Sequence, residues 1–96
     1  MTTNVLKPVQ GGGTNGIPDY LWWCPGCECC HGLWVSPGHK VRWSWNGSLD
    51  KPTCSPSFLC RGQYTCHTFV RDGVIEYLGD CTHKLARQKI PMIPFD

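Results

Sequence analysis

Short runs in which apolar and polar side chains alternate dominate this chain, and such runs predict β-strands. Residues 41–45 alternate strictly, with their three apolar side chains (Val, Trp and Trp) on one face. This pattern predicts a half-buried strand. An aromatic run at residues 20–23 and a short apolar run at residues 33–35 predict two more strands.

Residues 65–70 and 74–78 predict a β-hairpin, closed by a three-residue turn in which Gly73 adopts the left-handed conformation. If Val70 faces Val74, the alternation of side chains along a strand divides the hairpin into two faces. One face then carries His67, Phe69, Ile75 and Tyr77, and the other carries Cys66, Thr68, Val70 and Val74. The neighbours Cys66 and His67 are therefore predicted to have different roles.

Two further segments complete the predicted fold. Residues 50–57 contain two prolines, which predicts an extended piece that is not a central strand. Residues 81–88 are the one predicted helix, about two turns long, with Asp80 as its cap and Pro91 beyond its end. The sequence thus predicts a small, mostly-β, metal-stabilised fold: an antiparallel sheet resembling a zinc ribbon, with one short C-terminal helix.

The length and composition predict one domain that needs a covalent or metal staple. The chain has 96 residues, with eleven Gly and eight Pro, and only 17% of the residues are charged. A chain this short buries only about two-thirds of its unfolded surface, and a turn-rich domain with short elements usually needs such a staple. Residues 1–19 are polar and Gly-rich, which predicts a flexible arm with a short edge strand at 5–9. Residues 20–96 are predicted to form the domain.

Eight cysteines allow either a disulfide framework or a metal site. The chain begins without a charged region and apolar core of the signal-peptide type, and no apolar run is long enough to span a membrane. We therefore expect reduced thiols and a cytoplasmic location. The net charge of +2 is spread along the sequence rather than concentrated, so nucleic-acid binding is not expected.

The motif Cys24-Pro-Gly-Cys27 is typical of a zinc knuckle, a tight turn that supplies two of the four ligands of a structural zinc ion. The open end of the hairpin brings Cys66 and His83 toward one point, so these two residues are the first choice for the second pair. His67 in place of Cys66 is the main alternative, and His31 is a further candidate ligand.

A second group of polar residues suggests catalysis. Ser55 and Ser57 alternate with prolines in an extended segment, and a serine nucleophile needs a neighbouring base and an acid that orients the base. His67 is the spare histidine once Cys66 binds metal, and Asp80 or Asp72 is placed to orient it. Serine and proline in a loop are also ordinary turn residues, so residue types alone do not establish catalysis.

Several motifs together resemble a family of small phage and bacterial zinc-binding domains, often labelled "ammonia monooxygenase". The resemblance covers about residues 20–94. The motifs are Cys24-Pro-Gly-Cys27, His31-Gly32, Pro52-Thr-Cys-Ser-Pro-Ser57, Cys66-His67-Thr-Phe, Arg71-Asp-Gly-Val-Ile and Gly79-Asp-Cys-Thr-His83-Lys-Leu-Ala. The resemblance implies a phage or prophage origin, and a serine-type peptidase of bacterial ubiquitin-like conjugation operons that acts on the ubiquitin-like protein. Relatives have Ala-Gly where this chain has Ala86-Arg87.

Three functions therefore remain open. The first is a zinc-stabilised peptidase or hydrolase that acts on a host or ubiquitin-like protein, with Ser55 or Ser57, His67 and Asp80 as catalytic residues. Residues 20–23 and the Trp43 and Trp45 face would frame its substrate groove. The second is a non-catalytic zinc-ribbon module that inhibits or recruits a host protein through some of the five tryptophans. The third is a zinc ion that is itself catalytic, with three protein ligands.

Overall fold

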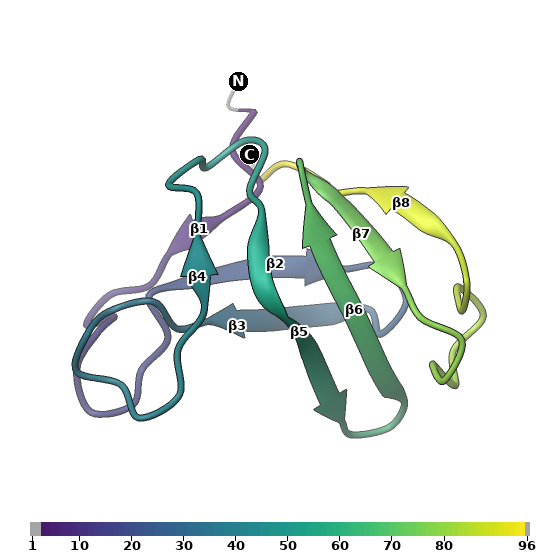
Figure 1. The fold of residues 1–96 in the computed structure, drawn as a ribbon, viewed down its shortest axis with the longest axis horizontal. Helices are drawn as coiled ribbons and strands as arrows, with labels where there is room; N and C mark the ends of the chain where they lie inside the picture. Colours follow the sequence, from purple (N-terminus) through teal and green to yellow (C-terminus); the bar gives the residue numbers. More distant parts are fainter. Residues whose placement is uncertain (1–2, 96) are drawn as a thin grey trace.

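Two antiparallel sheets form the protein in its computed structural model, which describes residues 3–95 (Figure 1). The first sheet has the order β1 (Lys7–Pro8), β2 (Tyr20–Cys24) and β3 (Cys29–Leu33). The second has its strands in chain order: β4 (Ser44–Trp45), β5 (Cys54–Arg61), β6 (Thr65–Arg71), β7 (Val74–Tyr77) and β8 (Lys89–Pro91). Consecutive pairing of this kind needs only short connections, which suits a chain rich in Gly and Pro.

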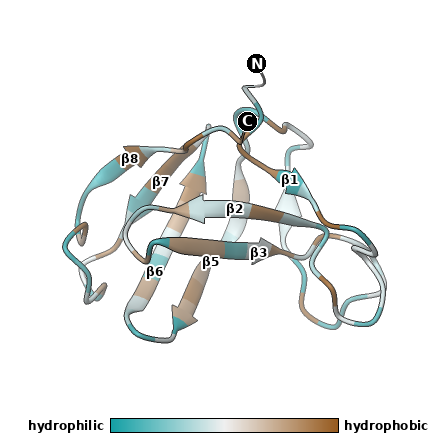
Figure 2. Ribbon diagram, turned by 180° about the vertical axis from the view of Figure 1, so that it is seen from behind, coloured by the Kyte–Doolittle hydropathy of each residue, from teal (hydrophilic) through white to brown (hydrophobic). Residues whose placement is uncertain are grey.

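The core lies where the two sheets cross. From either side, β2 and β3 run across the strands β5 and β6 (Figures 1 and 2). Trp22 is 1% exposed, and its ring packs edge-on against Phe58 of the second sheet at a centroid distance of 5.5 Å. Of the aromatic run at the start of the predicted domain, Trp22 therefore belongs to the core. The sequence predicted that this run frames a substrate groove, but the buried Trp22 does not line one.

The predicted C-terminal helix is wrong, because none of the residues 3–95 forms a helix. Residues 81–88 instead form successive turns, in which the Ala86 N–H donates to the His83 carbonyl and the Gln88 N–H to the Leu85 carbonyl. Arg87 has a φ of 69°, which breaks the right-handed backbone that a helix requires. Glycine, which the resemblance implies at this position, adopts such a φ without strain.

The proline-containing segment also differs from its prediction. Cys54–Arg61 forms β5, which is a central strand between β4 and β6. Its register on β6 shifts between Cys54 and Phe58, so the ladder is interrupted around Pro56, and the Ser55–Pro56 peptide is cis. A proline has no N–H to donate, and it is tolerated within a sheet at such a bulge.

The β6–β7 hairpin has a two-residue turn instead of the predicted three-residue turn. Asp72 and Gly73 both have positive φ, 50° and 75°, as a type I′ turn requires. Val70 consequently faces Ile75, and Thr68 faces Tyr77. The predicted separation of Cys66 and His67 is confirmed, since Cys66 is buried and His67 is only half-buried. However, Ile75 and Tyr77 share the face of Cys66, not that of His67.

The predicted strand at residues 41–45 and the predicted arm at residues 1–19 also differ in part from their predictions. Only Ser44 and Trp45 of the predicted strand 41–45 belong to β4, and Val41 is 70% exposed. The predicted arm 1–19 contains the edge strand β1 and contributes Val5 and Leu6 to the core. Residues 1, 2 and 96 of the predicted arm and domain lie outside the described residues.

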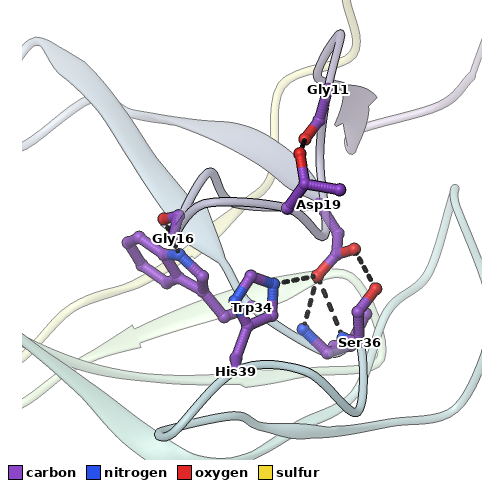
Figure 3. Close-up of polar contacts among 8 residues, drawn as sticks. Gly11, Gly16, Asp19, Trp34, Ser36 and His39 are labelled. Atoms are coloured by element: carbon purple, nitrogen blue, oxygen red, sulfur yellow. Dashed lines mark hydrogen bonds and ion pairs between the residues drawn. The ribbon is translucent and has the colours of Figure 1, made fainter.

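Asp19 fixes the loop that follows β3 (Figure 3). Its Oδ2 accepts the backbone N–H groups of Val35 and Ser36 at 2.8 and 3.0 Å and lies 3.2 Å from His39 Nε2, while its Oδ1 accepts the Ser36 hydroxyl. Burial alone would raise the pKa of Asp19, but the Ser36 hydroxyl, the two N–H groups and His39 together lower it to about 2. Asp19 is therefore ionised at neutral pH, and its carboxylate accepts the hydrogen bonds that hold the loop.

Replacing this carboxylate should destabilise the fold. Asp19→Asn removes the charge that accepts these hydrogen bonds and should lower the free energy of unfolding by about 1–3 kcal/mol. Because the folded pKa lies below the ordinary value of 3.8, the wild-type stabilisation is complete above that value and is lost as the pH falls toward 2. Urea unfolding at several pH values measures both effects. Asp50→Asn, at an exposed aspartate, is the control, and an equal loss in the two variants would contradict the assignment.

Candidate active site and metal cluster

A serine, a histidine and an aspartate form a continuous hydrogen-bonded chain on the outer side of the second sheet. Ser57 Oγ lies 2.9 Å from His67 Nε2. His67 Nδ1 lies 3.0 and 3.3 Å from the two carboxylate oxygens of Asp80. The side chains of His67 and Asp80 are 27% and 58% exposed, so the chain of contacts faces solvent.

The sheet places the first two residues. Leu59 of β5 faces His67 of β6, and Ser57 lies two residues before Leu59 on the same face. Ser57 and His67 are therefore diagonal cross-strand neighbours, whose side chains can meet. Phe58 lies between Ser57 and Leu59 in the chain, and its side chain points to the opposite face. It is 3% exposed and anchors this part of β5 to the core.

A tight turn places the aspartate. The Leu78 N–H donates to the His67 carbonyl at 2.9 Å, which extends the ladder beyond β7, and the Cys81 N–H then closes a turn on the Leu78 carbonyl. Asp80 lies in this turn, beside His67. Cys81 adds a second restraint, because its sulfur accepts the His67 N–H and its thiol donates to the His67 carbonyl, both at 3.3 Å.

The other sequence candidates lie elsewhere. Ser55 is exposed and faces Ser44 of β4, and among the described residues it makes no hydrogen bond to His67. Asp72 lies in the β6–β7 turn, where its N–H donates to the Thr53 hydroxyl. Of the residues proposed from the sequence, the structure thus brings together Ser57, His67 and Asp80.

This geometry can transfer a proton. With Nδ1–H donating to the Asp80 carboxylate, Nε2 of His67 is the acceptor that faces the Ser57 hydroxyl. The hydroxyl can then lose its proton to the imidazole as its oxygen attacks a carbonyl carbon, and the carboxylate stabilises the imidazolium that results. Hydroxyl, imidazole and carboxylate in this order are the arrangement of serine hydrolases.

On the inner side of β6, four side chains could hold a metal ion. The ligand atoms of Cys24, Cys27, His31 and Cys66 all lie within 4.8 Å of one another. The sulfurs of Cys24 and Cys66 are 3.8 Å apart, close to the ~3.8 Å edge of a tetrahedron with metal–sulfur distances of about 2.3 Å. The knuckle thus meets the hairpin as the sequence predicted.

The cluster has the electrostatic character of a metal site. Nε2 of His31 is buried and has no hydrogen-bond partner among the described residues. The Cys66 thiol, as a hydrogen-bond donor, lowers the pKa of Cys24 to about 3, while burial raises that of Cys27 to about 12. Burial alone would lower the pKa of His31, but the sulfurs of Cys24 and Cys60 raise it to about 10. The Cys24 thiolate thus lies among thiols and an imidazole that stabilise its negative charge, and this set of sulfur and nitrogen donors fits a metal cation.

His83, the fourth ligand of the first-choice set, lies beside the cluster in a second group with Cys66 and Cys81. Its Nε2 is 3.5 Å from the Cys66 sulfur, and its Nδ1 accepts the Leu85 N–H at 3.3 Å. An imidazole that accepts at Nδ1 carries its proton on Nε2. In this geometry His83 is a hydrogen-bond donor to the Cys66 sulfur.

Tyr77 is a contact that the sequence analysis missed. Its hydroxyl lies 3.1 Å from the Cys24 sulfur and accepts the Gly26 N–H at 3.3 Å. Such contacts orient metal ligands. The signal was present in the Asp72-Gly73 dipeptide, because a type I′ turn places Tyr77 on the face of Cys66.

The comparison with protein families assigns a family to this chain. The model of the family described as bacterial ubiquitination-like system serine protease (BubE) matches residues 8–78. The match covers most of the chain, which therefore belongs to this family. Searches of the curated proteins and of the solved structures give no significant match. Within the described part of the chain, no helix is long and apolar enough to cross a membrane.

The cluster should bind a stoichiometric metal ion that the fold requires. Apparent binding free energies of about 10–16 kcal/mol for structural zinc rival the entire net stability of a small domain, about 5–15 kcal/mol. Cys66→Ser should therefore lose both the metal and the cooperative unfolding transition. Elemental analysis and thermal unfolding measure these effects, with Cys30→Ser, at an exposed cysteine, as the control. Normal metal content in Cys66→Ser would contradict the assignment.

Proposed function

We propose that this chain is a serine peptidase with Ser57 as nucleophile, His67 as general base and acid, and Asp80 as the residue that orients His67. One observation carries the proposal: the continuous contacts from Ser57 through both ring nitrogens of His67 to Asp80. Membership of a family of serine proteases supports it.

The reaction follows from the geometry. Ser57 Oγ attacks the carbonyl carbon of the scissile bond while His67 Nε2 takes its proton. The protonated His67 then gives this proton to the leaving amine, which departs and leaves an acyl-serine. A water molecule, deprotonated by His67 in turn, hydrolyses the ester and restores Ser57. Throughout, Asp80 keeps the proton on Nδ1 and stabilises the imidazolium.

We further propose that the substrate is a ubiquitin-like protein inside the bacterial cell. The family belongs to a bacterial ubiquitination-like system, and the exposed position of Asp80 leaves room for a protein surface to approach. The structure pairs none of the eight cysteines in a disulfide, as is usual in a reducing compartment. A phage or prophage origin stays a prediction.

The cluster is proposed to bind a structural zinc ion through Cys24, Cys27, His31 and Cys66. Three thiolates and one imidazole are a common set for structural zinc. The tautomer of His83 favours His31 as the fourth ligand, so His83 serves the cluster as a hydrogen-bond donor. Four protein ligands leave no open position for a catalytic water, and the chemistry is assigned to Ser57.

Ser57→Ala should abolish covalent labelling by a fluorophosphonate probe, because the probe reacts only with an activated serine oxygen. Intact-protein mass spectrometry measures the added mass. Ser55→Ala is the matched control and should label at the wild-type rate, and both variants should retain metal. Labelling of Ser57→Ala together with loss of labelling in Ser55→Ala would assign the nucleophile to Ser55. No labelling of the wild type would favour the non-catalytic binding module.

Asp80→Asn should slow this labelling by roughly 10²- to 10⁴-fold, because an amide no longer holds His67 in the tautomer that accepts the Ser57 proton. The rate of mass gain at fixed probe concentration measures the effect. Asp72→Asn is the control, since asparagine tolerates the left-handed conformation of that turn. Equal rates in the two variants would refute the role of Asp80.

A further inference from the structure

A cavity of about 460 Å³ lies beside the proposed nucleophile and has no role in the mechanism above. It is formed by the loop that Asp19 fixes after β3 and by the approach to β4. Its lining residues are Gly16, Trp34, Gly38, His39, Lys40, Val41 and Trp43. A cavity of this volume falls within the range of ligand sites.

Two tryptophans form fixed walls of this cavity. The Trp34 indole N–H donates to the Gly16 carbonyl at 2.8 Å (Figure 3). The Trp43 ring stacks on Phe58 with a centroid distance of 5.0 Å and an interplanar angle of 8°. The two indoles lie 6.0 Å apart at 32° to each other. Val41, at 70% exposure, adds apolar surface that this chain leaves open to solvent.

The cavity is adjacent to Ser57. The Trp43 indole N–H donates to the Ser57 carbonyl at 3.4 Å, so a single side chain separates the cavity from the backbone of the nucleophile. An extended polypeptide advances about 3.3 Å per residue. Because Trp43 stacks on Phe58, on the face of β5 opposite the Ser57 hydroxyl, a substrate held at Ser57 would pass the edge of β5 and reach the cavity a few residues further along.

The polar edge of the cavity is cationic. Lys40 lines it, and Arg42 is exposed next to the lining residue Val41. The nearby Asp19 carboxylate is engaged by its own hydrogen bonds. The His39 side chain is only 5% exposed, with Nε2 at Asp19. With its Nε2 at Asp19 this imidazole is already engaged, which leaves Lys40 as the cation that lines the cavity.

We propose that the Trp34–Trp43 cavity is a substrate subsite, which takes an aromatic or large aliphatic side chain of the polypeptide and selects an adjacent carboxylate through Lys40. The two indoles provide the apolar contact, and the cationic edge provides the preference for an acidic neighbour. The role of the cavity as a subsite rests on the proposed peptidase function. Binding of a ligand in the cavity does not require catalysis and can be tested separately.

Binding is tested in the Ser57→Ala chain, in which turnover cannot interfere. N-acetyl-L-phenylalanine is titrated against the ¹⁵N-labelled protein, with N-acetyl-L-phenylalaninamide and N-acetyl-L-alanine as matched probes. Shifts should concentrate at Gly16, Gly38 and the Trp34 indole N–H. The amide, which lacks the carboxylate, should bind about two- to fivefold more weakly, the usual effect of one exposed charge pair. The alanine probe should not bind at the same concentrations.

Two exposed lining residues provide variants that leave the core intact. Val41→Ser should weaken binding of both phenylalanine probes, and Lys40→Glu should reverse the preference between acid and amide. The controls are Ile93→Ser, at another exposed apolar residue, and Lys51→Glu, at an exposed lysine outside the cavity. Absence of binding at millimolar probe, or equal effects of the lining and control variants, would overturn the cavity as a binding site.

The subsite role has its own readout in the catalytically intact chain. A proteome-derived peptide mixture is digested, and mass spectrometry identifies the cleavage sites. Wild type should favour bonds at a fixed spacing of a few residues from an aromatic or large aliphatic residue with an acidic neighbour, and Lys40→Glu should lose the acidic preference. Probe binding with an unchanged cleavage profile would overturn the subsite. Probe binding without cleavage by wild type would instead refute the peptidase.

Discussion

The contact between two sheets at one thiol–imidazole cluster is the constraint on which this structure depends. Cys24 and His31 come from the first sheet, Cys27 from the knuckle between its strands, and Cys66 from the second sheet. The apolar core between the sheets is small, as it must be in a chain of this length. A metal ion at the cluster would bind both sheets at once, and the relative position of the strands would then follow from its ligands.

Strand β6 connects this cluster to the proposed chemistry. Its alternation sends Cys66 inward to the sulfur cluster and His67 outward to Ser57. The following loop repeats the arrangement, because Asp80 points to the His67 ring while Cys81 holds the His67 backbone. The two sites thus lie back to back on the same pair of segments, and the geometry of His67 depends on how firmly Cys66 is held.

The bulge in β5 is the second structural feature that shapes the Ser57–His67–Asp80 site. A regular central strand cannot contain Pro56, since the ring removes a ladder donor. The interruption between Cys54 and Phe58 accommodates the proline and resets the register. In the register beyond the interruption Leu59 faces His67, so Ser57 is the diagonal neighbour of His67. The same strand packs Phe58 against Trp43, which links the serine to the aromatic cavity.

The sequence by itself determined much of the local chemistry. Residue types and spacing predicted the knuckle of Cys24 and Cys27, its meeting with Cys66, and the separation of Cys66 from His67, because these depend on short-range turns and on strand alternation. Ser57 and Asp80 were among the proposed partners of His67, but Ser55 and Asp72 were equally consistent with the spacing, since no local rule fixes how β5 pairs with β6.

Only the tertiary structure decided the remaining features. The segment 81–88 has helical composition, yet the contacts of His83 with Cys66 and the left-handed backbone of Arg87 hold it in turns. The pairing of β5 with β6 brought Ser57 to His67, and the pairing of β3 with β2 brought His31 to the cluster. The contacts of His83 with Cys66 and of Ser57 with His67 join residues that are distant along the chain, and local pattern carries no information about such contacts.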